Sequence, residues 1–386
     1  MERIEAQNVF VPGSLPDSTY ITRETKMGFT YEERLRQSLS MNGYLTVISG
    51  PSKIGKTVLC EKVVGLNSLV EMSGSDFVDK EIWTQIGIKA GMPYEGAMVT
   101  GNQSTTTSSE YYKLSKENVI EHYKNHGLVL LVDDFHYISL EIQMHMAQQF
   151  KDAIRRGFVV IIASLPHRSD DAIRMNPDLQ GRINIIDIDA WSKEELSEIP
   201  LRGFEKIGVD ISASQLKRLT EESIYSPQLM QLICLSICIL SKTDCHSIQC
   251  IEDAVIEKAF RFSTLNLDYR KIASVIRQGK NSRGKQRKTY HTIQWGELDL
   301  YGLILEALAI DPPMSRLSFE ELLKRILDLV DGEEKPTAAS LKDYLKNLQE
   351  LINEKGHSYE VIEWNDNSLY ILESLFLFYL RWGRDE

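Results

Sequence analysis

Apolar runs alternate with amphipathic stretches over the first half of the chain. Five short runs are rich in Val, Ile and Leu, which is typical of strands that are buried on both faces of a parallel sheet. The stretches between them have helical periodicity, so the pattern predicts an α/β core with a parallel sheet and crossover helices. The expected strands are residues 44–49, 69–72, 128–132, 159–164 and 183–188.

The second half of the chain has a different pattern, which predicts mostly helix. Ser192 and Glu195 form a capping-box signal at the start of an apolar helical pattern that continues to residue 268. The remainder predicts three helices and a hairpin that turns at residues 365–367, which is the layout of a winged helix. The three helices are expected at residues 298–309, 319–329 and 338–353.

These changes of pattern divide the chain into five predicted parts. An N-terminal segment precedes the α/β core, and a helical lid, a basic linker and a winged-helix domain follow it. Inside the core region, the polar run at residues 101–109 is expected to be a mobile surface loop. The predicted boundaries are 1–43, 44–190, 191–276, 277–296 and 297–386.

The composition favours a soluble protein of the cytoplasm. Of the 386 residues, 42% are hydrophobic, which is enough for sizeable cores. No run approaches the ~18 uninterrupted apolar residues of a membrane span, and the N-terminus has no signal-peptide pattern. Five cysteines is a low and odd number for this length, which is typical of reduced thiols.

The net charge of −11 conceals one basic segment. Between Tyr269 and Gly296 there are eight Lys or Arg residues and no Asp or Glu. An acidic chain does not coat nucleic acid non-specifically, but a basic segment can contact phosphate locally. Residues 277–288 are therefore interpreted either as a solvated loop or as a contact for phosphate or an acidic partner.

The strongest chemical signal lies at residues 50–57, between a predicted strand and a predicted helix. It matches the phosphate-binding pattern G-x-x-x-x-G-K-[ST], in which glycines let backbone N–H groups surround phosphates and the helix start adds partial positive charge. Lys56 is expected to contact the β- and γ-phosphates, and the Thr57 hydroxyl to ligate Mg²⁺. The predicted nucleotide-binding residues of this segment are Gly50, Pro51, Ser52, Lys53, Ile54, Gly55, Lys56, Thr57 and Val58.

An acidic pair supplies the second half of this predicted site. Asp133 and Asp134 follow the apolar strand at residues 128–132, and carboxylates at the C-terminal ends of parallel strands face the ligand crevice. Asp133 is expected to hold Mg²⁺ with Thr57, and Asp134 to orient or deprotonate the attacking water. Asp134 is one methylene shorter than the Glu that is usual in rapid ATPases, and a misplacement of about 1 Å can cost ~10²-fold in rate. We therefore expect slow hydrolysis.

Four further polar residues near strand ends have two interpretations each. Ser164 or Arg168 either senses the γ-phosphate or is solvated in a loop. Arg182 either acts as a finger on the nucleotide of a neighbouring subunit or pairs a carboxylate at a helix end. His136 either influences the catalytic water or has a hydrogen-bonded structural role.

A group of cysteines in the predicted lid invites a zinc interpretation. Cys234 and Cys238 lie four residues apart in a very apolar helical stretch, and Cys245, His246 and Cys250 follow. The paired C-x-x-C spacing of zinc ribbons is absent, and free cysteine packs as a small buried hydrophobe. Core packing is therefore the favoured interpretation.

Taken together, these motifs resemble the AAA+/STAND branch of P-loop ATPases, and archaeal-type and origin-recognition-like ATPases in particular. The phosphate loop, the acidic pair, Ser164, the Gly181–Arg182 element and a helical lid carry the resemblance. It implies ATP and Mg²⁺ as cofactors, and an adenine-contacting N-terminal segment with Tyr20 and Arg23. It also implies that Pro227 packs near the base, and it suggests a homo-oligomer or a separate effector protein, in prokaryotic regulation or antiviral defence.

The sequence thus predicts an ATP-binding, slowly hydrolysing switch that controls self-assembly or a partner protein. The alternative is a DNA-binding loader or initiator, in which the winged helix and residues 277–288 hold the duplex. The third helix of the predicted winged helix mixes Lys342 and Lys346 with Asp343 and Glu350, which is a poor composition for a groove-facing helix. A third interpretation is a nucleotide-bound scaffold that never turns over.

Overall fold

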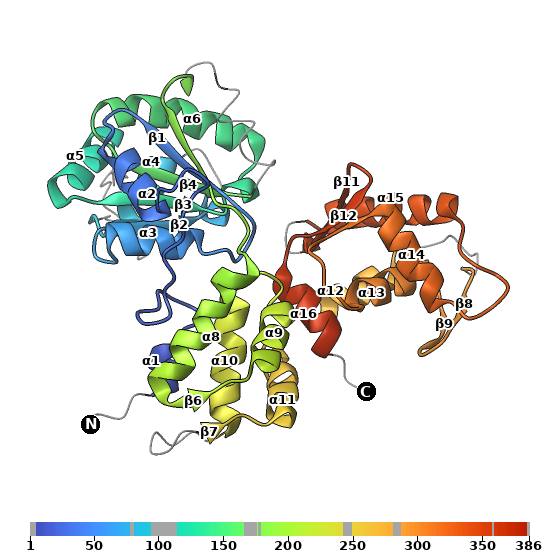
Figure 1. Ribbon diagram of the computed structural model, residues 1–386. Helices are drawn as coiled ribbons and strands as arrows, with labels where there is room; N and C mark the ends of the chain where they lie inside the picture. Colours follow the sequence, from blue (N-terminus) through green and yellow to red (C-terminus); the bar gives the residue numbers. More distant parts are fainter. Residues whose placement is uncertain are drawn as a thin grey trace, which may run out of the picture. The chain divides into compact units, whose positions relative to one another are not determined.

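The computed structural model describes residues 5–77, 81–93, 114–165, 176, 179–241, 249–280, 287–356 and 359–383. The chain divides into two compact units. The first unit comprises Met1–Ile21, Ser52–Ile54 and Ala190–Glu386, and the second comprises Thr22–Pro51 and Gly55–Asp189 (Figure 1). Each unit is described by itself.

The second unit is built on a five-stranded parallel sheet. The strands occur in the order β2-β3-β4-β1-β5, so β1 lies between β4 and β5. All five predicted strands are confirmed, each within one residue at either end. The apolar runs of the three inner strands are largely buried, whereas the edge strands β2 and β5 are mostly half-buried. The strands are β1 (Leu45–Ser49), β2 (Leu69–Ser73), β3 (Val129–Asp133), β4 (Val160–Ser164) and β5 (Ile183–Asp187).

Helices cover both faces of this sheet. On one face lie α2 (Tyr31–Ser40) and α3 (Lys56–Val64), and the Ser38 and Thr46 hydroxyls hydrogen-bond at 2.7 Å between α2 and β1. The helices α4 (Ile82–Lys89), α5 (Lys116–His126) and α6 (Leu140–Arg155) belong to the other face. The core on that face contains Leu45, Val47, Trp83, Tyr123, Leu130, Val132, Phe150, Phe158, Val160 and Ile162.

The first unit begins with a short helix that packs on a helical bundle. Phe10, just after α1 (Ala6–Val9), meets Phe204 of α8 (Lys193–Ile207) with ring centroids 5.1 Å apart. Ser192 and Glu195 form the predicted capping box at the start of α8. The two-stranded pair of β6 (Val209–Asp210) and β7 (Gln249–Cys250) interrupts the predicted helical stretch. The helices are α8 (Lys193–Ile207), α9 (Ala213–Glu222), α10 (Pro227–Ser241), α11 (Asp253–Thr264) and α12 (Arg270–Gln278).

The C-terminal part of the first unit has the three helices and the hairpin that the sequence predicts for a winged helix. The helices are α13 (Leu300–Ala309), α14 (Phe319–Leu329) and α15 (Ala338–Lys355), and β11 (Ile362–Asn365) pairs with β12 (Ser368–Ile371). The sequence did not reveal β10 (Arg316–Ser318), which adds a third antiparallel strand, or the hairpin of β8 (Tyr290–Thr292) and β9 (Gly296–Leu298). This hairpin lies in the region that was expected to be a linker.

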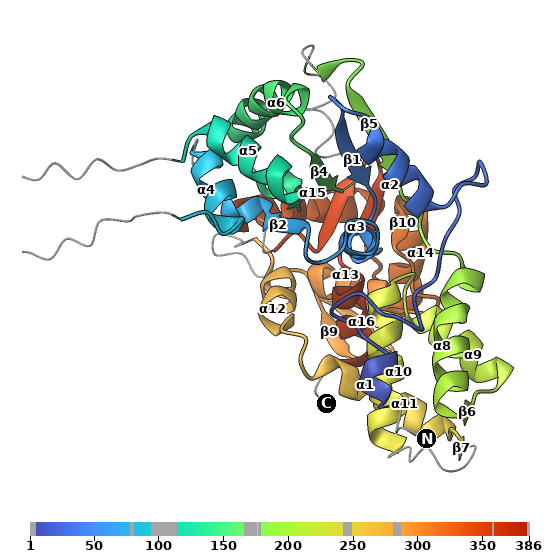
Figure 2. The ribbon, with the colours of Figure 1, turned by 90° about the vertical axis from the view of Figure 1, so that its left-hand side faces the viewer.

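The last helix, α16 (Ser374–Trp382), packs against both α13 and α11. Figure 2 shows it between the helices of the bundle and those of the C-terminal part. Its side chains Phe376 and Phe378 are fully buried, which explains why aromatic residues recur there at helical spacing. Helix α16 therefore joins the two parts of this unit.

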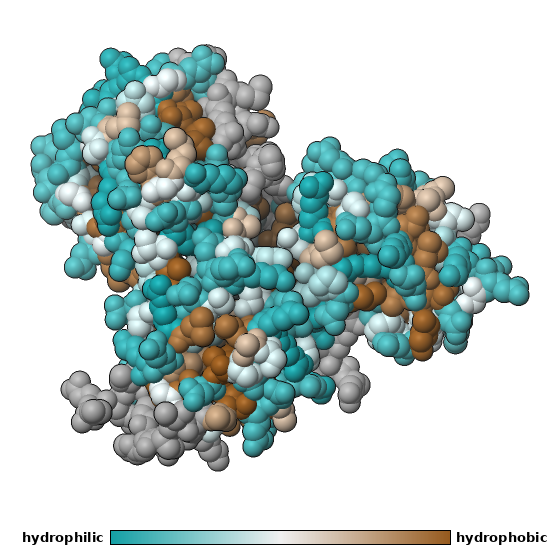
Figure 3. Space-filling model, in the orientation of Figure 1, coloured by the Kyte–Doolittle hydropathy of each residue, from teal (hydrophilic) through white to brown (hydrophobic). Residues whose placement is uncertain are grey.

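The surface of the helical bundle is partly apolar. Figure 3 shows hydrophobic surface over α8 and α10, and exposed apolar side chains of the bundle include Leu201, Ile239, Phe262 and Leu265. Among the described residues, no helix has the length and apolar character that a membrane crossing requires.

Candidate nucleotide site

The phosphate-binding pattern forms a loop between β1 and α3, at the C-terminal edge of the parallel sheet. Gly55 precedes α3 at φ +102°, a conformation that side-chain-bearing residues rarely adopt, and no described atom lies within 4 Å of the position that a Cβ would take. Among the described residues no side-chain hydrogen bond caps the start of α3, and backbone N–H groups at a helix start are a common site of phosphate binding. Gly55 thus gives the loop a left-handed backbone with open space beside it, which allows a phosphate to approach the main chain.

Lys56 and Thr57 occupy the first turn of α3. Lys56 is 7% exposed, and its ammonium donates to the carbonyl oxygens of Gly50 and Pro51, both at 2.9 Å, so it lies across the loop. The Thr57 hydroxyl donates to the Asp133 carboxylate, 76 residues further along the chain. The structure therefore brings together the two residues that the sequence predicted as Mg²⁺ ligands.

Ser164 ends β4 directly beside the phosphate loop. Its carbonyl oxygen accepts a hydrogen bond from the Gly50 N–H at 3.2 Å, and the residue is 1% exposed. The Ser164 Oγ has no hydrogen-bond partner among the described residues. Because buried hydroxyls are nearly always paired, this atom fits a phosphate oxygen or a bound water at the site.

Behind the loop, Cys60 of α3 is fully buried. Burial raises the pKa of its thiol well above the usual value, and the charge of Asp133 raises it further. The thiol therefore stays protonated, which makes it a packing residue and not a nucleophile.

Asp134 has an unusual backbone conformation. It lies at φ +51° and ψ +41°, donates its N–H to Asp133 Oδ1 at 2.8 Å, and accepts at its carbonyl from the Tyr137 N–H at 2.9 Å. Gly74, which follows β2, approaches this residue because Ser73 and Asp133 are register partners. A Cβ added to Gly74 would lie 2.4 Å from the Asp134 carbonyl oxygen. Gly74 is thus a positioning residue that sequence reasoning missed.

We expect Gly74→Ala to slow nucleotide hydrolysis by about 10- to 10²-fold and to leave the Kd for ATP unchanged, because the methyl group displaces the Asp134 backbone and not the phosphate loop. Single-turnover hydrolysis and an ATP titration measure the two effects separately. Gly332→Ala is the control, since no described atom lies within 4 Å of its Cβ position. A tenfold weaker Kd with an unchanged rate would contradict this role for Gly74.

Arg182 lies at the opposite edge of the sheet from the phosphate loop. Its carbonyl oxygen accepts from the Leu45 N–H at 2.8 Å, at the start of β1, whereas Gly50 follows the end of β1. Five residues of strand separate these ends by about 16 Å. Arg182 therefore cannot reach the phosphate loop of its own chain.

The predicted adenine-side residues divide between the two units. In the second unit, Arg23 is 7% exposed and donates to the Asp189 carbonyl oxygen at 3.0 Å. In the first unit, the Thr19 hydroxyl, next to Tyr20 in the sequence, accepts a hydrogen bond from the Gln231 side-chain amide at 2.8 Å. Gln231 lies one helical turn after Pro227 in α10. Tyr20 and Pro227 thus belong to the same region of the bundle.

The start of α10 also explains locally why serine and proline occur at positions 226 and 227. The Ser226 hydroxyl accepts from the Leu229 N–H at 3.2 Å, and Pro227 is the first residue of α10. Serine at the N-cap and proline at the first helical position are the preferred start of a helix. This interpretation was available from the sequence and was missed.

The tip of the phosphate loop, Ser52–Ile54, groups with the first unit. There the Ile54 carbonyl oxygen accepts from Trp191 Nε1 at 2.9 Å, and Ser52 Oγ donates to the Glu373 carboxylate at 2.5 Å. Lys53 has φ +60°.

The four described cations of residues 277–288 pair with carboxylates. Arg277 pairs with Glu306 at 3.0 Å, and Lys280 pairs with Glu350 at 2.7 Å. The two remaining cations follow the same pattern, with Arg287 on Asp299 at 2.9 Å and Lys288 on Glu334 at 2.8 Å. The Arg287 side chain is 20% exposed, whereas those of Lys280 and Lys288 are 38% and 55% exposed, so the solvated-loop and phosphate-contact interpretations of this segment both stay predictions.

Several candidates lie outside the described residues, namely Arg168, Cys245, His246 and the loop at 101–109. Cys234 and Cys238 are buried in α10, as expected for core packing. In the part of the chain that the structure describes, no cluster of three His, Cys, Asp or Glu side chains is arranged to hold a metal ion.

No protein-family model and no curated protein matches this sequence. Solved structures similar to the chain include the Walker-type ATPase PABY2304 of Pyrococcus abyssi, with a TM-score of 0.50 and 14% identity over 90% of this chain and 94% of that chain. Cdc6p from Pyrobaculum aerophilum has a TM-score of 0.47 and 15% identity, and 98% of each chain is covered. The ORC2 protein of Aeropyrum pernix has a TM-score of 0.47 and 15% identity over 94% of this chain and 95% of that chain.

The likeness to the Pyrococcus abyssi protein extends over most of both chains and concerns the fold. Together with the five-stranded parallel sheet and the loop between β1 and α3, it shows that the chain has a P-loop NTPase α/β core, as the sequence predicts.

Proposed function

We propose that this protein binds ATP with Mg²⁺, hydrolyses it slowly, and uses the nucleotide as a conformational switch. One observation carries the proposal: Lys56, Thr57 and Asp133 meet at the sheet edge where the buried Ser164 hydroxyl lacks a partner among the described residues. A cationic side chain, a helix start and a hydroxyl–carboxylate pair are the components that a nucleoside triphosphate and its metal need.

Each residue has a distinct task in this proposal. Lys56 leaves the loop carbonyls and contacts the β- and γ-phosphates, while the Gly55-led helix start binds phosphate oxygens. Thr57 and Asp133 offer the oxygen ligands that Mg²⁺ prefers, and the metal supplies charge neutralisation when bound. Asp134 orients the attacking water and accepts its proton, and Ser164 contacts the γ-phosphate.

In this proposal Arg182 acts on the nucleotide of a second copy of the chain. Its position about 16 Å from the phosphate loop argues against a role at the nucleotide site of its own chain. Such an arginine stabilises the charge of the transition state and contributes ~10³- to 10⁵-fold in rate in related chemistry. The switch would then control self-assembly, and a role in prokaryotic regulation or defence stays a prediction from the family resemblance.

A mixing experiment tests hydrolysis and assembly together. Arg182→Ala keeps an intact phosphate loop, and Lys56→Ala keeps an intact arginine, so each variant alone is expected to lose at least ~10²-fold in turnover. In an equimolar mixture, roughly a quarter of the head-to-tail interfaces join an intact loop to an intact arginine, and we expect about that share of wild-type activity. Arg155→Ala, an exposed arginine of α6, serves as the control. A mixture no more active than its separate components would rule out the trans role.

A further inference from the structure

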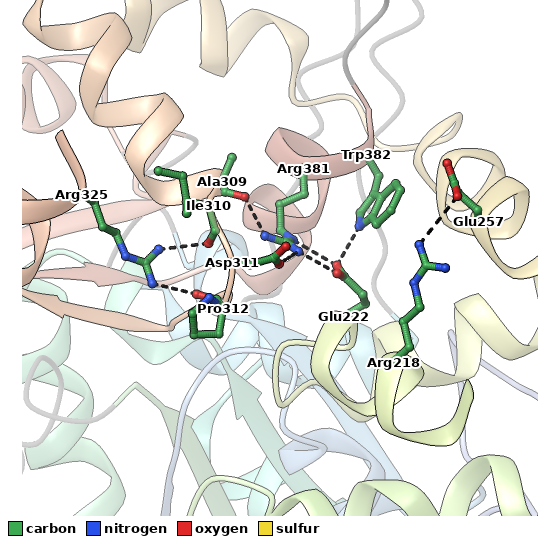
Figure 4. Close-up of polar contacts among 10 residues, drawn as sticks. All are labelled: Arg218, Glu222, Glu257, Ala309, Ile310, Asp311, Pro312, Arg325, Arg381 and Trp382. Atoms are coloured by element: carbon green, nitrogen blue, oxygen red, sulfur yellow. Dashed lines mark hydrogen bonds and ion pairs between the residues drawn. The ribbon is translucent and has the colours of Figure 1, made fainter. Parts of the chain in front are cut away.

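The ends of α16 and α9 meet in a buried cluster of charged and polar groups (Figure 4). Arg381 donates to both carboxylate oxygens of Glu222, at 3.0 Å from Nε and 2.6 Å from a terminal nitrogen. Trp382 Nε1 donates to the same carboxylate at 2.7 Å. The Arg381 and Glu222 side chains are 6% and 9% exposed, so the pair is almost fully withdrawn from water.

This pair fixes the position of α16. Arg381 also donates to the Ala309 carbonyl oxygen at 2.6 Å and to Asp311 at 2.5 Å, and the Trp382 ring lies 4.8 Å from that of Phe260. A buried ion pair is weak evidence for stability, because desolvation offsets the attraction. Its better-attested use is to specify one arrangement of the elements that it joins.

The residues directly after Glu222 form a turn that their sequence disfavours. Ile224 and Tyr225 have φ values of +49° and +57°, and the Ser226 N–H donates to the Ser223 carbonyl oxygen at 2.9 Å. These are the φ signs of a type I′ turn, which Asn and Gly normally supply. Two left-handed residues with large side chains disfavour the turn roughly 30- to 900-fold, which is about 2–4 kcal/mol at 1.36 kcal/mol per factor of ten.

A turn of this kind persists only where its surroundings determine it. Ser223, Ile224 and Ser226 are buried, and Ser226 begins α10 as its N-cap. On the other side, Glu222 is held by Arg381 and Trp382. We propose that α16 is a clamp that holds the α9–α10 turn in its left-handed conformation, so that withdrawal of α16 relaxes the turn and shifts the Ser226–Pro227 start of α10.

The opposite end of α16 is tied within the same unit. Glu373, the residue before the helix, accepts from the Tyr269 hydroxyl at 3.0 Å and from Ser52 Oγ at 2.5 Å. Residues at both ends of α16 are thus held within the first unit, Glu373 by Tyr269 and Arg381 by Glu222.

Hydrogen exchange of the peptide that spans residues 219–230 tests the clamp in the nucleotide-free protein, so the result does not depend on the proposed ATPase activity. Arg381→Gln is expected to raise the exchange rate of the Ser226 amide at least ~10-fold. Without the Arg381–Glu222 pair, nothing offsets the backbone strain of the left-handed residues Ile224 and Tyr225. Adding Tyr225→Asn should restore protection to within ~3-fold of wild type, since asparagine tolerates the left-handed region. Tyr225 is 40% exposed, so this change removes little packing.

A matched control is Phe262→Asn in the Arg381→Gln background. Phe262 is 36% exposed in the same unit but lies outside the turn, so it should give no rescue. Trp382→Phe, which loses the hydrogen bond to Glu222 and keeps a ring on Phe260, is expected to raise exchange ~3-fold and takes the place of Arg381→Gln if that variant does not fold. Unchanged exchange in the clamp variants, or failure of Tyr225→Asn to rescue them, overturns the proposal.

Discussion

Replacing Lys56 with alanine is expected to abolish ATP binding at micromolar nucleotide while the protein stays folded. The Lys56 ammonium is the buried cation of the loop, and a hydrogen bond from a charged donor contributes about 1.5–3 kcal/mol. Loss of two such bonds to phosphates corresponds to a Kd at least ~10²-fold higher. Titration with a fluorescent ATP analogue measures this Kd directly.

The helix that follows the loop offers a matched control for this charge change. Lys62→Ala removes an exposed lysine of α3 outside the predicted nucleotide-binding residues, and it is expected to change the Kd less than ~3-fold because surface charges contribute little. Thermal melts of both variants check folding, since Lys56 donates to two loop carbonyls. Equal losses of affinity in the two variants would mean that net positive charge, and not the placement of Lys56, binds the nucleotide.

Local sequence signals were enough to predict the parts of the site that each depend on one strand and its end. The phosphate loop and Asp133 could be read from a β-branched run followed by glycines or carboxylates. Parallel strands bring these ends to one edge whatever their order, so the approach of Thr57 to Asp133 followed without knowledge of the strand order.

Features that depend on register or on distant pairing could not be predicted. Gly74 approaches Asp134 only because Ser73 pairs with Asp133, and a glycine that follows a strand most often serves an ordinary turn. Glu222 and Arg381 are 159 residues apart, and neither stands out from its own helix. The basic segment was interpreted from charge alone, whereas the four described cations of residues 277–288 pair with carboxylates of the C-terminal part.

The αL backbone of Asp134 gives a physical reason for the short carboxylate at this position. Aspartate and asparagine tolerate the left-handed region better than glutamate does, so a longer acid costs about 1 kcal/mol of folding stability there. The chain therefore combines a favourable turn with a carboxylate that reaches less far toward the γ-phosphate. The slow turnover that we propose and the local backbone stability would then have the same origin.

Asp134→Asn should consequently retain ATP binding and lose hydrolysis by ~10²- to 10⁴-fold, because the amide keeps the backbone conformation but cannot accept the proton of the attacking water. The variant should accumulate in the ATP state, so the particle mass in ATP reports any nucleotide-driven assembly without turnover. Asp366→Asn makes the same substitution at another left-handed aspartate, φ +46°, in the hairpin turn between β11 and β12, and should leave hydrolysis unchanged.

The opposite substitution sharpens the test. Asp134→Glu is expected to raise the single-turnover rate about tenfold or more while it lowers the melting temperature, since the longer side chain gains reach at the cost of backbone strain. Both quantities are measured on one preparation. If Asp134 only shaped the turn before α6, the hydrolysis rate would fall together with the melting temperature. That result would exclude Asp134 from the chemistry and leave Asp133 as the single carboxylate of the acidic pair with a role in hydrolysis.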